Sequence, residues 1–159
     1  MTLLVDVLEE QGLDSIDAVL FALPGVGDVG KNAVELLNEA NDARAVARFI
    51  HPGLTPLARL DEDGLLAPPH LLAQRIDTEN GPSILTITGR GQPSESFQQH
   101  DFTTQLLKHL SQAGMKELIV LAGLMSTPEI KEAFAVATSS AHRVLSLIHI
   151  SEPTRRYRI

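Results

Sequence analysis

The chain has 159 residues, of which 43% are hydrophobic and 21% charged, and this suits one globular domain with a sizeable core. The absence of cysteine excludes disulfides, thiolate metal sites and a cysteine nucleophile. A net charge of −7 and an aromatic content of 4% disfavour nucleic-acid binding, and no apolar run is long enough to span a bilayer. No basic segment leads into an apolar signal region, so we expect a cytoplasmic protein that binds neither nucleic acid nor a membrane.

The first strong element of the chain is a strand that runs into a glycine-rich turn and a helix. Residues 1–14 are only weakly amphipathic and predict a strand or a short helix. A continuous apolar run over Ala18–Leu23 predicts a strand covered on both faces, and Pro24 follows it directly. Helical spacing of apolar residues then predicts a helix over Asn32–Ala40.

The middle of the chain is interrupted by prolines. Partial alternation over Ala43–Ile50 predicts a second strand. Between Gly53 and Gln74 several prolines predict loop with short extended pieces rather than a long strand. Ser83–Thr88 is rich in β-branched residues and predicts another strong strand.

The last third of the chain continues the alternation of helix and strand. Asp101–Ala113 has one apolar face and predicts a helix that begins near His100, and Glu117–Ala122 predicts a third buried strand. A further helix is expected over Glu129–Thr138. Repeated alternation of this kind indicates an α/β sandwich with a mostly parallel sheet.

The glycine-rich turn fits a dinucleotide fingerprint only in part. Gly25, Gly27 and Gly30 have the required spacing between a strand and a helix. Such a site also needs an acidic residue at the end of the second strand to hold the ribose hydroxyls. That strand ends in Ile50 and His51, so the carboxylate is absent and the fingerprint remains a weak indication.

The same turn fits a triphosphate-binding loop no better. Gly25–Lys31 has the G-x-x-x-x-G-K spacing, but Asn32 stands where the loop needs a serine or threonine for magnesium. No aspartate closes either later strand, and Asp28 inside the loop would repel phosphate. Two further hypotheses remain: a tight strand-to-helix crossover that needs glycines for steric reasons, or a helix N-terminus that binds some other anion.

The candidate site residues are therefore those of this loop, namely Gly25, Gly27, Asp28, Gly30 and Lys31. We interpret the loop as structural, with contact to a ligand or a partner as an additional role. The histidines are scattered without ligand spacing, and the acidic run at residues 61–63 lacks the spacing of a calcium loop. No nucleophile elbow is present, so we expect no catalytic residue, no metal site and no cofactor.

The end of the chain has an unusual composition. Leu145–Arg155 reads LSLIHISEPTR, which looks like a translated sequencing adaptor of the kind that contaminates assembled environmental DNA. The alternative is a genuine strand over Val144–Ile150 with a polar tail. We expect residues 1–144 to form an incomplete natural domain and residues 145–159 to be a non-native tail.

Several segments, taken together, resemble the proteasome assembly chaperone 2 family. They are LPGVGDVGKNAVELL at residues 23–37, DGLLAPP at 63–69, SILTITGRGQP at 83–93, the segment at 100–123 and AVATSS at 135–140. The resemblance implies a three-layer α/β/α sandwich with phosphorylase-like architecture, of which the C-terminal part is missing here. It also implies a non-catalytic protein that binds proteasome subunits and forms a homo-oligomer when complete. A nucleotide- or nucleoside-binding enzyme that uses Gly25–Lys31 is the alternative.

Overall fold

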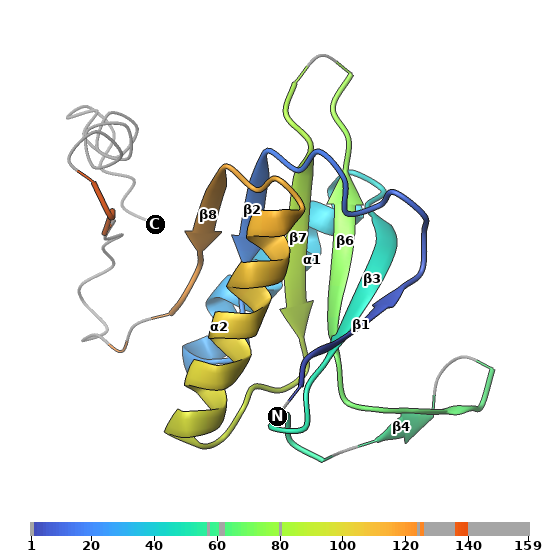
Figure 1. Ribbon diagram of the computed structural model, residues 1–159, viewed down its shortest axis with the longest axis vertical. Coiled ribbons are helices and arrows are strands. Elements are labelled where there is room, and N and C mark those ends of the chain that lie inside the picture. Colours follow the sequence, from blue (N-terminus) through green and yellow to red (C-terminus); the bar gives the residue numbers. More distant parts are fainter. Residues whose placement is uncertain are drawn as a thin grey trace. The chain divides into compact units, whose positions relative to one another are not determined.

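The computed structural model describes residues 2–56, 58–60, 63–79, 81–123, 125 and 136–139. The chain divides into two compact units, Met1–Leu124 and Met125–Ile159. Every strand and helix below belongs to the first unit (Figure 1). The expected tail over residues 145–159 and most of the expected helix over Glu129–Thr138 lie outside the described residues.

The first unit is built on a six-stranded sheet with the strand order β1-β3-β6-β7-β2-β8 (Figure 1). The strands are β1 (Leu4–Val7), β2 (Ala18–Phe21), β3 (Arg44–Ile50), β6 (Leu71–Ile76), β7 (Ile84–Gly89) and β8 (Glu117–Val120). A separate two-stranded hairpin is formed by β4 (Arg59–Leu60) and β5 (Leu66–Ala67). The sequence therefore predicted the class and most strands, but it missed the strand at Leu71–Ile76.

The sheet is mixed, which corrects the prediction of a mostly parallel sheet. Strand β2 pairs in parallel with both β7 and β8, as expected for strand–helix–strand crossovers. The other pairs, β1–β3, β3–β6 and β6–β7, are antiparallel. The physical reason is β6, which follows the hairpin and returns beside β3 without a crossover helix, so the proline-rich region contributes a central antiparallel strand.

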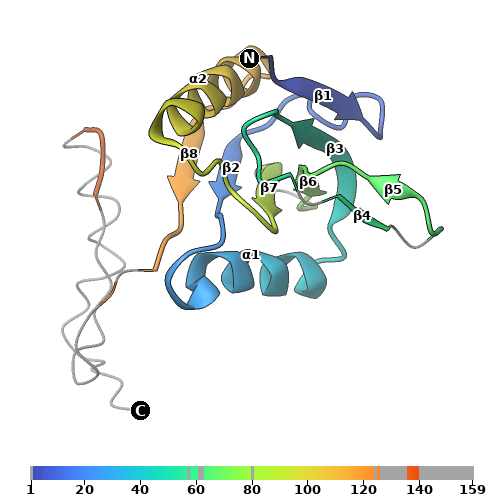
Figure 2. The same ribbon diagram turned by 90° about the horizontal axis from the view of Figure 1, so that it is seen from below.

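Two helices lie on opposite faces of this sheet (Figure 2). Helix α1 (Val29–Ala40) follows β2 through a short 3₁₀ turn, η1 (Val26–Asp28), and helix α2 (Ser96–Gln112) connects β7 to β8. Both helices begin earlier than the sequence predicted, α2 by five residues. The first turn of α2 is polar apart from Phe97, which is exposed and lies outside the buried face formed by Phe102, Leu106 and Leu110.

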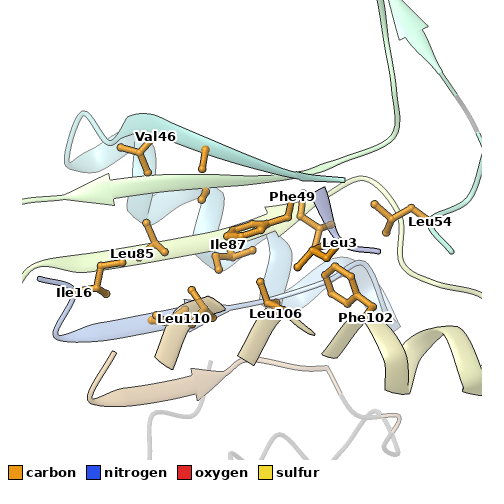
Figure 3. Packing of buried hydrophobic residues seen from close by; sticks show 14 residues of the cluster. Leu3, Ile16, Val46, Phe49, Leu54, Leu85, Ile87, Phe102, Leu106 and Leu110 are labelled. Atoms are coloured by element: carbon orange, nitrogen blue, oxygen red, sulfur yellow. The ribbon is translucent and has the colours of Figure 1, made fainter. Parts of the chain in front are cut away.

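The main core lies between the sheet and α2 (Figure 3). Leu85 and Ile87 on β7 and Phe49 on β3 are fully buried against the helix side chains Leu106 and Leu110. Since side chains alternate along a strand, the intervening Thr86 faces α1 instead. The hydroxyl of Thr86 donates to the Asn38 side-chain oxygen at 2.7 Å, so a buried polar contact joins α1 to the centre of the sheet.

Strand β8 is shorter and less covered than the buried strand that the sequence predicted over Glu117–Ala122. Ile119 is 40% exposed and Val120 is 61% exposed, whereas Leu118 packs against the core. The strand lies at the end of the strand order and pairs only with β2 in the described part of the chain. Its apolar composition therefore does not reflect burial within this unit.

An arginine clamps the segment between β1 and β2 onto the sheet. Arg75 on β6 donates to the backbone carbonyl oxygens of Gly12 and Asp14 at 3.2 and 2.7 Å. Its Nε also donates to an Asp77 carboxylate oxygen at 2.8 Å, and Arg44 donates to the other oxygen at 2.6 Å. The hydrogen bond from Arg75 is the main reason that the pKa of Asp77 lies below its usual value of 3.8.

This clamp predicts an acid-labile contribution to stability. Because the pKa of Asp77 is lowered in the folded state, the ionised carboxylate stabilises the fold above pH 3.8 and loses this effect as the pH falls through the folded pKa. We expect Asp77→Asn to lower the melting temperature at pH 7 and to reduce its decline below about pH 4. Asp42→Asn, which removes an exposed acid, is the control for the change in net charge. Identical pH profiles for the wild type and Asp77→Asn would contradict the prediction.

Candidate functional site

The glycine loop closes on itself at the carboxyl end of β2. Gly27 and Asp28 both have a left-handed backbone, with φ of 63° and 50°. The backbone N–H of Asp28 donates to the carbonyl of Gly25 at 3.1 Å. In return, the N–H of Gly25 donates to the Asp28 side chain at 3.2 Å. The carboxylate of Asp28 thus accepts a backbone hydrogen bond that an anion-binding loop would offer to phosphate.

The space beside the loop is taken by the chain that leaves β8. A Cβ on Gly30 would lie 2.4 Å from the carbonyl oxygen of Leu121, and a Cβ on Gly123 would lie 2.3 Å from that of Val26. Two glycines therefore allow the β8 exit to pack directly on the first turn of α1. At Gly30 the requirement is close backbone approach, as in a tightly packed crossover.

The lysine of the loop is engaged within its own helix. The Lys31 ammonium forms an ion pair with Glu35 one turn later, at 2.7 Å. All the predicted site residues thus lie together in η1, with its N-cap Gly25, and the first turn of α1. However, the Lys31 ammonium is paired with Glu35, and the Asp28 carboxylate accepts the backbone N–H of Gly25. The arrangement matches neither the lysine nor the free backbone donors of a phosphate-binding loop.

The topology nevertheless places this loop where α/β sheets commonly bind ligands. The connection after β2 passes through α1 to β3, and the connection after β7 passes through α2 towards β8 on the other side. Loops that diverge from neighbouring parallel strands in this way form a switch point. Beside it, the Thr88 hydroxyl is buried and has no hydrogen-bond partner among the residues described.

A second feature is an apolar groove near the edge of the sheet that is formed by β1, opposite the β8 edge. It has a volume of about 430 Å³ and lies between the ends of β1 and β3 and the β4–β5 hairpin. Besides His51, its lining is entirely apolar: Leu4, Ile50, Pro52, Leu54, Pro56, Ala58, Leu66, Pro68 and Pro69. From the sequence these prolines were expected only to break strands, whereas the structure gathers them into one surface.

The hairpin beside the groove carries exposed leucines. Leu60, Leu65 and Leu66 are 70%, 65% and 72% exposed. Leu4 in edge strand β1, which also lines the groove, is 60% exposed. Leu60 lies directly opposite Leu66 across the hairpin, and exposed aliphatic side chains that cluster in this way are typical of protein-binding sites. We refer to the groove and these hairpin leucines together as the hairpin surface.

A buried histidine fixes one wall of the groove. His51 Nδ1 accepts the N–H of Gly53 at 3.0 Å, so Nε2 carries the proton and donates to Asp101 at 3.2 Å. The ring also meets Phe102 edge-on, with centroids 5.6 Å apart. Both ring nitrogens are therefore occupied, and His51 ties the loop after β3 to α2. No sequence spacing pointed to this pair, because fifty residues separate its members.

The Asp101 carboxylate is held in its ionised form. Burial alone would raise its pKa, but hydrogen bonds, those from Gln105 and His51 foremost among them, lower it, and the pKa lies below its usual value of 3.8. In the described ranges no three histidine or acidic side chains are grouped closely enough to hold a metal ion. Likewise, none of the described helices is both long and apolar enough to cross a membrane.

Residues 19–155 match the sequence profile of the PAC2 family, and the chain belongs to this family. The resemblance to proteasome assembly chaperones seen in the sequence is thereby confirmed. No curated protein matches the chain.

Solved structures support the same fold at low sequence identity. Pyrococcus furiosus PbaB, an archaeal proteasome activator, superposes with a TM-score of 0.71 at 20% identity, over 82% of this chain and 54% of that one. P. furiosus PbaA, an archaeal homolog of proteasome-assembly chaperone, gives 0.56 at 19% identity, with 84% and 53% covered. A Thermoplasma acidophilum protein of unknown function gives 0.57 at 20% identity, with 76% and 48% covered. The chain thus spans about half the length of these structures.

The close approach at Gly30 predicts a sharp difference between two loop glycines. Gly30→Ala should destabilise the fold by about 2 kcal/mol, since the new methyl would meet the backbone of Leu121 and overpacking outweighs the gain in helix propensity. Gly25→Ala should change the free energy of unfolding by no more than about 0.5 kcal/mol. The backbone of Gly25 is extended, and the atom nearest to the new Cβ would be the carbonyl oxygen of Leu23 at 3.9 Å. Urea unfolding of both variants measures the difference, and equal stabilities would contradict the packing role.

Proposed function

We propose that this chain is a non-catalytic, chaperone-like protein that binds protein clients, in proteasome assembly or in association with proteasomes. Membership of the PAC2 family supports this proposal, as does the fold shared with an archaeal proteasome activator and a proteasome-assembly chaperone homolog. The observation that carries it is the hairpin surface, where an apolar groove adjoins three exposed leucines. Such a surface suits an apolar segment of a protein partner.

The remaining expectations from the sequence belong to the same proposal. The protein acts in the cytoplasm without a cofactor, and it forms a homo-oligomer when full length. We further propose that its complete fold is a three-layer sandwich of phosphorylase-like architecture, of which residues 1–144 form a part. Residues 145–159 are proposed as a non-native tail, although the family profile extends to residue 155. The glycine loop serves as a structural turn, which agrees with its internal hydrogen bonds and its contact with the β8 exit.

A binding assay with purified proteasome α subunits tests the proposal. We expect the double variant Leu60→Ser/Leu66→Ser to bind them about tenfold or more weakly than the wild type, because both side chains are exposed anchors on the hairpin. Leu107→Ser on α2 removes another exposed leucine and should bind like the wild type. Failure of the wild type to bind any α subunit would refute the proposed function, and equal binding by the double variant would refute the hairpin surface as its site.

The second candidate function is a nucleotide- or nucleoside-binding enzyme that uses Gly25–Lys31. The switch-point position and the unpartnered Thr88 hydroxyl favour it, whereas the internal pairing of Asp28 and Lys31 opposes it. Calorimetry with ATP, GTP, NAD and NADP should give no dissociation constant below about 1 mM. A micromolar constant that Lys31→Ala abolishes would establish the enzyme in place of the chaperone.

A further inference from the structure

Helix α1 is apolar over a wider arc than the sheet covers. The residues of α1 buried against the sheet are Gly30, Val34 and Asn38. A second line of small and aliphatic residues runs along the helix at spacings of four, three and four positions: Val29, Ala33, Leu36 and Ala40. We call this line the α1 seam. The α1 seam holds a valine and a leucine, while the sheet-facing side of the helix holds Val34 and the half-buried Leu37 beside a glycine and an asparagine.

The α1 seam is exposed along its whole length. Val29 is 60% exposed and Leu36 is 65% exposed, and both alanines are exposed as well. Val26 in η1, one turn earlier, is 45% exposed and extends the line towards the glycine loop. An amphipathic helix normally turns its larger apolar side chains towards the core, so this helix presents a second apolar face to solvent.

The geometry of the α1 seam suits another helix. Spacings of four and three residues form the stripe along which paired helices contact one another. Large residues at Val29 and Leu36 alternate with small ones at Ala33 and Ala40, which leaves shallow hollows for the side chains of a partner. The helix has 12 residues and is therefore about 18 Å long, which matches a partner helix of three to four turns.

The charge around the α1 seam selects the kind of helix. Residues 26–42 contain four acidic side chains, Asp28, Glu35, Glu39 and Asp42, against the single Lys31. That lysine is already paired with Glu35. A second copy of the chain would place the same acidic residues opposite one another, which is unfavourable. A helix with basic residues beside its apolar stripe would be complementary in both shape and charge.

We propose that the α1 seam binds an amphipathic helix of a partner protein whose apolar stripe is flanked by lysine or arginine. This site is distinct from the hairpin surface, which is lined by β1, β3 and the hairpin, whereas α1 packs on β7 and the exit of β8. The protein thus has two separate apolar surfaces for contacts with other proteins.

Fluorescence anisotropy with two synthetic helical probes of about 16 residues tests this proposal. One probe combines a leucine stripe with lysine flanks, and the other has the same stripe with glutamate flanks. We expect the lysine probe to bind with a micromolar dissociation constant and the glutamate probe to bind at least about tenfold more weakly. The double variant Val29→Ser/Leu36→Ser should bind the lysine probe about tenfold more weakly than the wild type. Circular dichroism would confirm that these substitutions at exposed positions leave the fold intact.

Two matched variants show whether the probe binds at the α1 seam or at any exposed leucine or acidic surface. Leu60→Ser/Leu66→Ser removes equally exposed leucines from the hairpin and should bind the lysine probe like the wild type. Glu35→Lys/Glu39→Lys keeps the α1 seam and should shift the preference towards the glutamate probe. Neither probe is a proteasome subunit, so a probe that does not bind would leave the proposed function unaffected. Equally, a failure to bind proteasome subunits would leave the proposal for the α1 seam unaffected.

Several results would overturn the proposal. The first is that the lysine probe does not bind the wild type. The second is that it binds Val29→Ser/Leu36→Ser as tightly as the wild type. The third is that the lysine and glutamate probes bind the wild type equally well. A wild-type dimer that dissociates in Val29→Ser/Leu36→Ser during sedimentation would assign the α1 seam to a second copy. Binding that appears only after residues 125–159 are deleted would assign it to the chain's own C-terminal segment.

Discussion

The rest of the structure depends on burial of β7 on both of its faces. Leu85 and Ile87 pack under α2, while Thr86 and Thr88 are buried on the side of α1. The strand also pairs in parallel with β2 and antiparallel with β6, so it joins the crossover half of the sheet to the antiparallel half. A buried polar group at such a position needs a partner, and Asn38 supplies one for Thr86 across the helix–sheet interface.

The glycine loop shows how a sequence pattern associated with phosphate binding can be satisfied by the protein itself. Its acid bonds to a backbone N–H, its lysine pairs with Glu35, and the backbone of Leu121 lies against Gly30. Spacing alone cannot reveal this, because the β8 exit that packs against the loop lies some ninety residues further along the chain. The loop therefore positions α1 on the sheet, and its exposed apolar residues, Val26 and Val29, continue into the α1 seam.

The apolar surfaces share one physical origin. Hydrophobic residues that find no cover within the unit remain on the hairpin, on α1 and on β8. Exposed apolar area of this kind is costly for an isolated chain and is typical of proteins that work through contacts with other proteins. A family of chaperone-like proteins and this distribution of exposed residues are mutually consistent.

The sequence by itself determined the α/β class, the strands at β2, β3 and β7, and the family, because long apolar runs and helical periodicity are local signals. Tertiary structure decided the antiparallel half of the sheet, since β6 directly follows Pro68 and Pro69 and the sequence therefore indicated loop up to Gln74. It also decided which apolar residues are buried: α1 and β8 have patterns typical of covered elements, yet Leu36 and Val120 are exposed. The physical reason is that periodicity shows only where a face is apolar, while burial depends on which elements the fold brings against that face.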